Sequence, residues 1–158
     1  MSETAMIIMI IAYGTLPLIM AITFYRLKKT LATLGKNIQP FPARPAYQFI
    51  GILIASPSLI ALPLIRSFDF LTIFAITGVG IMGFFIAFQE LIYSRYSGLY
   101  EKGIVWNAIS VKFEDIDRME KEGSNTIVFI LFDRTKKVLV CQDETIALRI
   151  EQAISTLH

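Results

Sequence analysis

The stretch FLTIFAITGVGIMGFFIAFQELIY, residues 70–93, decides how this chain is organised. It has no charged residue before Glu90, and at about 1.5 Å per residue a helix of this length crosses a hydrocarbon layer of about 30 Å. The chain before it is largely apolar, whereas the chain after it alternates short apolar runs with carboxylates and lysines. This pattern predicts that residues 70–93 form the last membrane-spanning helix and carry a water-exposed C-terminal segment.

The composition supports that division. Of the 158 residues, 54% are hydrophobic and 18% are charged, which argues against a single soluble domain. Residues 1–93 hold six of the 15 Lys and Arg but three of the 13 Asp and Glu, so the C-terminal part is nearly neutral and lacks the basic face of a nucleic-acid-binding domain. We expect a three-span transmembrane domain over residues 1–93 and a cytoplasmic module over residues 94–158.

The three predicted spans cover about residues 5–25, 49–65 and 70–92. A secretory signal peptide is the rival interpretation of the first, but the segment before it carries Glu3 and no Lys or Arg. Leucines continue at helical spacing after this span, so its helix can extend as an amphipathic segment that stops near Gly35.

Five basic residues follow the first span, with no acidic residue before Tyr47: Arg26, Lys28, Lys29, Lys36 and Arg44. By the positive-inside rule this loop is cytoplasmic, which places the N-terminus outside and the C-terminus in the cytoplasm. The alternative role for the same residues is contact with anionic lipid. Pro40, Pro42 and Pro45 predict an extended, stiff connector that acts as a spacer.

The second and third spans are joined by a turn of four residues, 66–69, so they should be antiparallel neighbours. Small residues lie on one face of each: Gly51, Ala55 and Ser58 on the second span, and Gly80, Gly83 and Ala87 on the third. Pairing them in reverse order keeps a constant register, and small residues allow close approach of helices in lipid. The sequence therefore predicts a tightly packed hairpin, with a homodimer seam or a chance occurrence as the alternatives.

No Asp, Glu, Lys, Arg or His lies within the cores of the predicted spans. Ion and proton pathways usually retain such residues in spite of their cost in lipid. Secondary transport and proton pumping are therefore disfavoured, and a small channel or transporter subunit is the least favoured functional class.

The C-terminal part is predicted to be a small α+β module. Strands are expected at residues 98–101, 104–106, 109–113, 126–132 and 137–142, the fourth being central because it is almost wholly apolar. Asp143 is the expected N-cap of a closing helix, and Trp106 the expected core aromatic. The helix has one apolar stripe that should cover the sheet: Ile146, Ile150, Ala153, Ile154 and Leu157.

The pattern GLYEKGIVWNAISVKFEDIDRMEK (98–121), then NTIVFILFDRTKKVLVC (125–141), then a helix, resembles the reduced pleckstrin-homology-like (PH-like) tails of small bacterial membrane proteins. With three preceding spans, the chain resembles the YobD-type family of small inner-membrane proteins. The resemblance implies a PH-like cytoplasmic module and an inner-membrane location, and it supplies no catalytic residues.

Residues suited to catalysis or metal binding are scarce. His158 is the only histidine and Cys141 the only cysteine, so His-based triads, intramolecular disulfides and Cys-based metal sites are excluded. Cys141 lies in an apolar strand and is expected to be an inert core residue. The segment GVGIMG (78–83) lacks the strand-to-helix context of a dinucleotide loop. We therefore expect no cofactor and a non-enzymatic accessory or scaffold protein. Its expected partners are membrane lipids and a membrane protein or a second copy of itself. The alternative function is an anionic-lipid-binding module.

Overall fold

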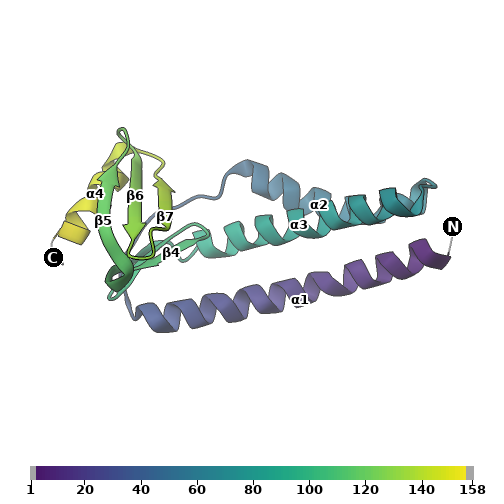
Figure 1. The fold of residues 1–158 in the computed structure, drawn as a ribbon, viewed down its shortest axis with the longest axis horizontal. Coiled ribbons are helices and arrows are strands. Elements are labelled where there is room, and N and C mark those ends of the chain that lie inside the picture. Colours follow the sequence, from purple (N-terminus) through teal and green to yellow (C-terminus); the bar gives the residue numbers. More distant parts are fainter. Residues whose placement is uncertain (1–2, 156–158) are drawn as a thin grey trace. The chain divides into compact units, whose positions relative to one another are not determined.

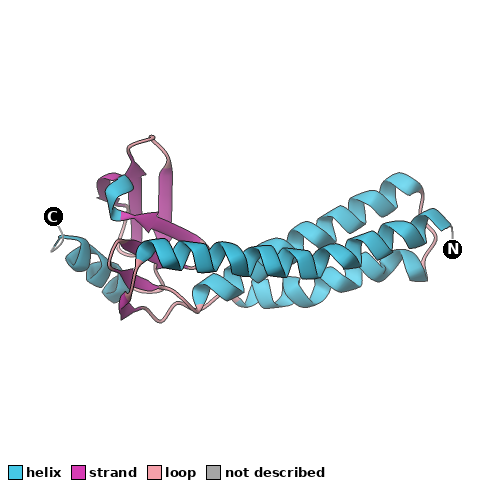
Figure 2. Cartoon of the chain, turned by 90° about the horizontal axis from the view of Figure 1, so that it is seen from below, coloured by secondary structure: helices cyan, strands magenta, loops and turns pink. Residues whose placement is uncertain are grey.

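The computed structural model describes residues 3–155, apart from the side chains of residues 4 and 5, and divides into two units. Unit 1 comprises Met1–Lys28 and Pro45–Ile92, and unit 2 comprises Lys29–Arg44 and Tyr93–His158. Three long helices account for unit 1, whereas the strands of the described residues all lie in unit 2 (Figure 2). The chain therefore passes from one unit to the other three times.

The long helices are α1 (Glu3–Leu34), α2 (Tyr47–Ile65) and α3 (Phe70–Ser94) (Figure 1). Each is long and apolar enough to cross a membrane, in agreement with the three predicted spans. Helix α1 continues beyond the first predicted span and ends at Leu34, where Gly35 takes the left-handed conformation (φ +82°) and its N–H donates to the Leu31 carbonyl. That end point confirms the predicted stop near Gly35 and follows from the ease with which glycine adopts a positive φ.

The turn between α2 and α3 is closed by a cap. The Asp69 carboxylate accepts hydrogen bonds from the Thr72 hydroxyl (2.5 Å) and the Thr72 N–H (3.0 Å). Carboxylates are favoured at this position because the first N–H groups of a helix have no partner within the helix. The same hydrogen bonds, that of the Thr72 side chain first, lower the pKa of Asp69.

Unit 2 contains two antiparallel sheets and a closing helix. The first sheet has the order β1-β2-β3-β4, with bounds β1 Asn37–Pro40, β2 Gly98–Tyr100, β3 Gly103–Trp106 and β4 Ile109–Lys112. The second has the order β5-β6-β7, with bounds β5 Ile116–Lys121, β6 Thr126–Leu131 and β7 Lys136–Val140. Helix α4 spans Glu144–Ser155.

Most of this arrangement agrees with the sequence predictions. The five predicted strands are present, β6 is central and mostly buried, and the Ile146 N–H donates to the Asp143 carboxylate (2.9 Å), as expected of an N-cap. One sheet was expected and two are found, because the 3₁₀ turn Phe113–Asp115 separates β4 from β5. Strand β5 was not predicted, since IDRMEK has mixed polarity and exposed side chains.

Strand β1 is the main departure from the predictions. Residues 37–40 were expected to belong to the loop between the first two spans, with Pro40 in its extended connector, but Asn37 pairs with Tyr100 and Pro40 with Gly98, which makes this segment the edge of the first sheet. Proline is tolerated there because an edge strand leaves one side of its backbone unpaired. Residues 29–44 are consequently part of unit 2, which the sequence-based division at residue 94 did not include.

The core of unit 2 lies between the sheets and α4. Trp106 is 2% exposed, as predicted, and its indole N–H donates to the Val140 carbonyl (3.0 Å). Phe41, which follows β1, also belongs to this core, with its ring centroid 6.3 Å from that of Trp106. The α4 stripe contributes Ile146, Ile150 and Ile154, with Ala153 packed at the margin; Leu157 lies outside the described residues.

Candidate interaction sites

The predicted packing face of α3 lies against α2. Gly80 and Ala87 are buried and Gly83 is half-buried. A Cβ atom on Gly80 would lie 2.8 Å from Ile60 Cγ1 and 3.1 Å from the Ser56 carbonyl oxygen, and one on Gly83 would lie 3.0 Å from Ser56 Oγ. Both glycines therefore stand where a larger side chain would push the two helices apart.

The α2 half of the predicted pairing is wrong. Gly51, Ala55 and Ser58 are exposed, and a Cβ on Gly51 would meet no described atom outside its own helix within 4 Å. The residues that contact the α3 glycines are Ile52, Ser56 and Ile60. Each residue turns a helix by about 100°, so the face that contacts α3 is rotated by more than a quarter turn, roughly 130°, from the predicted one.

The buried Ser56 explains why the sequence did not reveal this face. Its hydroxyl donates to the Ile52 carbonyl (2.6 Å), so a polar side chain that is 2% exposed still has a hydrogen-bond partner. The isoleucines on either side are branched, and they fill the space above the glycines of α3. The prediction assumed small residues on both helices. The contact instead places the glycines of α3 against a face of α2 that carries two isoleucines, so the sequence pattern did not reveal it.

Helix α1 completes the packing of unit 1. The Tyr13 hydroxyl donates to the Pro57 carbonyl of α2 (2.9 Å). Ala12 and Leu16 share an apolar cluster with Ile60, Phe84 and Phe88. Phe88 also stacks on Phe84 and meets Phe24 edge-on, each with 5.7 Å between ring centroids.

The five basic residues predicted for the first loop do not form one loop. Arg26 and Lys28 lie on α1 in unit 1, whereas Lys29, Lys36 and Arg44 belong to unit 2. All five are exposed to solvent. The set is therefore a series of accessible cations along α1 and around β1.

The segment around Lys36 is held by the backbone of the β2–β3 turn. The Glu101 N–H donates to the Lys36 carbonyl (3.1 Å), the Lys102 N–H donates to the Leu34 carbonyl (3.0 Å), and the Lys36 N–H donates to the Glu101 carboxylate (3.2 Å). The last carbonyls of a helix normally lack partners within it. Here the carbonyls at the end of α1 accept hydrogen bonds from the backbone of the β2–β3 turn, in which Glu101 lies 65 residues after Lys36.

Gly103 is required by the same junction. A Cβ at this position would collide with the Val111 carbonyl oxygen and lie 2.6 Å from Leu34 Cδ2. Leu34 is 1% exposed, so it cannot move away into solvent. The last turn of α1 is thus packed directly on the first sheet of unit 2.

Cys141 has the properties of a core residue. It is 1% exposed, and burial, with a smaller contribution from the Asp143 charge, raises the pKa of its thiol to about 11. A thiol of this kind is a poor nucleophile at neutral pH. Within residues 3–155, no group of three or more His, Cys, Asp or Glu side chains is placed to hold a metal ion.

A comparison with protein-family models, with curated proteins and with solved structures found no match.

Proposed function

We propose that this chain is a non-enzymatic accessory or scaffold protein of the bacterial inner membrane, in which three spans hold a small PH-like module in the cytoplasm for a membrane-protein partner. The observation that carries the proposal is the discontinuous construction of unit 2. Its first strand precedes the α2–α3 hairpin and its other strands follow it, so the module is joined to the apolar helices at three points of the chain. A module joined to the apolar helices in this way is suited to presenting a binding surface near the membrane.

One feature of the fold supports the PH-like assignment, and one feature of the charge distribution supports the proposed orientation. The antiparallel strands and the closing C-terminal helix of unit 2 support the PH-like assignment, with two sheets in place of the single sheet that the sequence pattern predicted. The exposed cations after the first span support the proposed orientation, since positive residues favour the cytoplasmic side.

The orientation is tested by cysteine labelling from one side of the membrane. Two single variants are made, Ser67→Cys in the α2–α3 turn and Ser124→Cys between β5 and β6, and each is labelled in spheroplasts. The unchanged chain is the blank, because its Cys141 is buried. An impermeant maleimide should label position 67 from outside and position 124 only after the membrane is opened. Labelling of both positions from outside would contradict the three-span arrangement.

The partner is tested by purification of the full chain in a mild detergent after cross-linking in cells. A defined companion protein in a constant ratio is the expected result. Recovery of the chain as a monomer without a companion, from cells cross-linked under several conditions, would contradict the scaffold role.

Anionic-lipid binding is the second candidate function, because Arg26, Lys28, Lys29, Lys36 and Arg44 are all exposed. Each such cation near an anionic surface contributes about 1 kcal/mol to the attraction. Lipid retained through detergent purification should then be enriched in phosphatidylglycerol, and replacement of these residues by glutamine should remove the enrichment. Equal lipid composition with and without the replacements would exclude this role for the five residues.

A further inference from the structure

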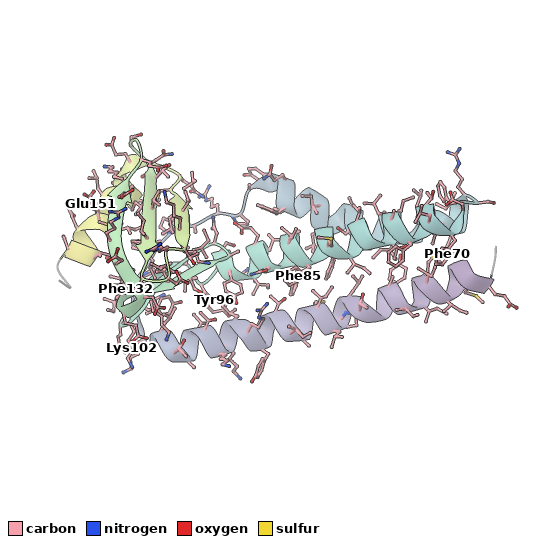
Figure 3. The ribbon with its side chains drawn as sticks, viewed as in Figure 1. Phe70, Phe85, Tyr96, Lys102, Phe132 and Glu151 are labelled. Atoms are coloured by element: carbon pink, nitrogen blue, oxygen red, sulfur yellow. The ribbon has the colours of Figure 1, made fainter. Side chains whose placement is uncertain are left out.

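The turn between β6 and β7 has an unusual surface for a soluble module. Phe132 is 69% exposed at the end of β6, where Figure 3 labels it. On β7, Val138 is 43% exposed and Val140 is 58% exposed. Single exposed apolar residues are common on proteins, but Phe132 and Val138 occur in the same hairpin as the exposed cations Arg134 and Lys136.

Val138 and Val140 share the face of the second sheet that α4 does not cover. Val128 pairs with Val138, Thr126 with Val140 and Ile130 with Lys136, so Val138, Val140 and Lys136 lie on one face. Phe132 follows the last residue of β6 and lies in the turn. The residues one position along, such as Phe129 and Leu139, belong to the core that contains α4. The exposed valines and Lys136 are therefore turned away from that core, and Phe132 lies exposed in the turn next to them.

Cations accompany this apolar set. Arg134 and Lys136 are exposed, and Lys137 is half-buried. Two acids lie nearby: Asp133 in the turn, and Asp115, which lines a shallow depression with Leu131, Phe132 and Asp133. The exposed cations stand at the turn and on β7, beside the apolar side chains.

The turn has a defined shape. The Thr135 N–H donates to the Asp133 carboxylate (2.8 Å), which engages that acid within the turn. The Arg134 N–H donates to the Leu131 carbonyl (2.8 Å), and the Leu131 N–H donates to the Thr135 carbonyl (3.0 Å). Arg134 takes a positive φ of 65°, a conformation that non-glycine residues adopt in few turns. The aromatic and basic side chains are therefore carried on an ordered hairpin.

We propose that Phe132, with Val138, Arg134 and Lys136, forms a contact site for the surface of an anionic lipid bilayer. An exposed aromatic ring and valines suit the boundary between headgroups and acyl chains, while the two cations suit anionic headgroups. The proposal rests on the membrane anchoring proposed above, which keeps the module close to a bilayer. It concerns a different part of the chain from the basic residues of α1 and β1.

The test uses the full chain, one copy per nanodisc, with Phe132→Cys carrying an environment-sensitive fluorophore. Cys141 stays in place because it is buried, and the unchanged chain is the labelling blank. Ser124→Cys is the matched control, since residue 124 lies in the turn at the opposite end of β6. Nanodiscs are made of phosphatidylcholine alone or with 30% phosphatidylglycerol, and iodide quenching is measured.

The label at position 132 should be shielded from iodide in the anionic nanodiscs and exposed in the neutral ones, whereas the label at position 124 should be exposed in both. Adding Arg134→Glu and Lys136→Glu should remove the shielding, and Arg149→Glu on α4 should leave it. One cation near the surface corresponds to about a fivefold change in a contact equilibrium. The double replacement should therefore shift it by more than tenfold.

Two results would overturn the proposal. Equal exposure of position 132 in both lipid mixtures would show that it does not contact the bilayer. Equal shielding in both mixtures would show an apolar or protein contact in place of an anionic one. Because both faces of a nanodisc are accessible, neither result depends on the orientation, which the labelling at positions 67 and 124 tests separately.

Discussion

At the scale of single residues, the positions that matter most are those with no room for an added atom. Gly103 and Gly80 are the strongest cases, since a Cβ on either would collide with a buried neighbour. Protein interiors are packed as densely as organic crystals, so a single added methyl group forces neighbouring atoms to move. Gly80 was predicted as part of the packing face of the third span, whereas Gly103 does not stand out in the sequence from glycines that have open space around them.

Replacing Gly103 by alanine should destabilise unit 2 by about 1–3 kcal/mol, because the new methyl group collides with the Val111 carbonyl and with Leu34. The measurement is the urea midpoint of the full chain in detergent, followed by Trp106 fluorescence. Gly14→Ala is the control, since a Cβ there has no described atom within 4 Å beyond its own helix. Equal midpoints for the two variants would contradict the packing described at the junction.

Cys141 should resist thiol reagents in the folded chain. With a pKa raised to about 11 by burial, its thiolate fraction at pH 8 is about one in a thousand. Maleimide modification at pH 8 should be slow in detergent and complete within minutes in denaturant, as measured by mass spectrometry. Rapid modification of the folded chain would show that residue 141 is accessible.

At the scale of elements, the sequence predicted the helices and most strands but only half of the hairpin contact. Uncharged runs and alternating patterns are local signals, and they located α1, α2 and α3 and the strands of unit 2. The face of α2 depends on how branched side chains fit above glycines on another helix, which is a property of two segments together. Strand β1 was missed for the same reason, because NIQP forms a strand only where β2 is beside it.

The hairpin contact can be tested with two neighbouring glycines of α3. Gly80→Ala should destabilise unit 1 by about 1–3 kcal/mol, because its methyl group would lie 2.8 Å from Ile60 Cγ1. Gly78→Ala should leave the stability unchanged or raise it slightly, since no described atom beyond its own helix lies within 4 Å and alanine favours helix. The two variants are compared by their unfolding in increasing concentrations of dodecyl sulfate. An equal loss of stability in both would contradict the observed contact between α2 and α3.

At the scale of the whole molecule, unit 2 is complete only when residues 29–44 join residues 93–158. The earlier segment supplies β1, the buried Leu34 and Phe41, and the carbonyls that accept from the β2–β3 turn. Phe41 alone is 6% exposed, and removal of a buried phenylalanine side chain costs about 3–5 kcal/mol. That is a large share of the stability of a small domain.

Residues 94–158 alone should therefore fail to fold cooperatively, whereas residues 29–44 joined to 93–158 by a Gly/Ser linker in place of the hairpin should fold. Urea unfolding followed by Trp106 fluorescence distinguishes the two chains. The linked chain with Phe41→Ala is the control, and it should unfold at a much lower urea concentration. A cooperative transition in residues 94–158 alone would show that β1 is dispensable.

The position of the hairpin between β1 and β2 has a consequence for biogenesis. During synthesis β1 leaves the ribosome first and has no strand to pair with until the hairpin and β2 have followed. If only one of α2 and α3 entered the bilayer, β1 and β2 would emerge on opposite sides and the first sheet could not form. With the three-span arrangement proposed above, assembly of the sheet would depend on insertion of both helices, and a wrongly inserted copy would be left unfolded and open to the proteases of quality control.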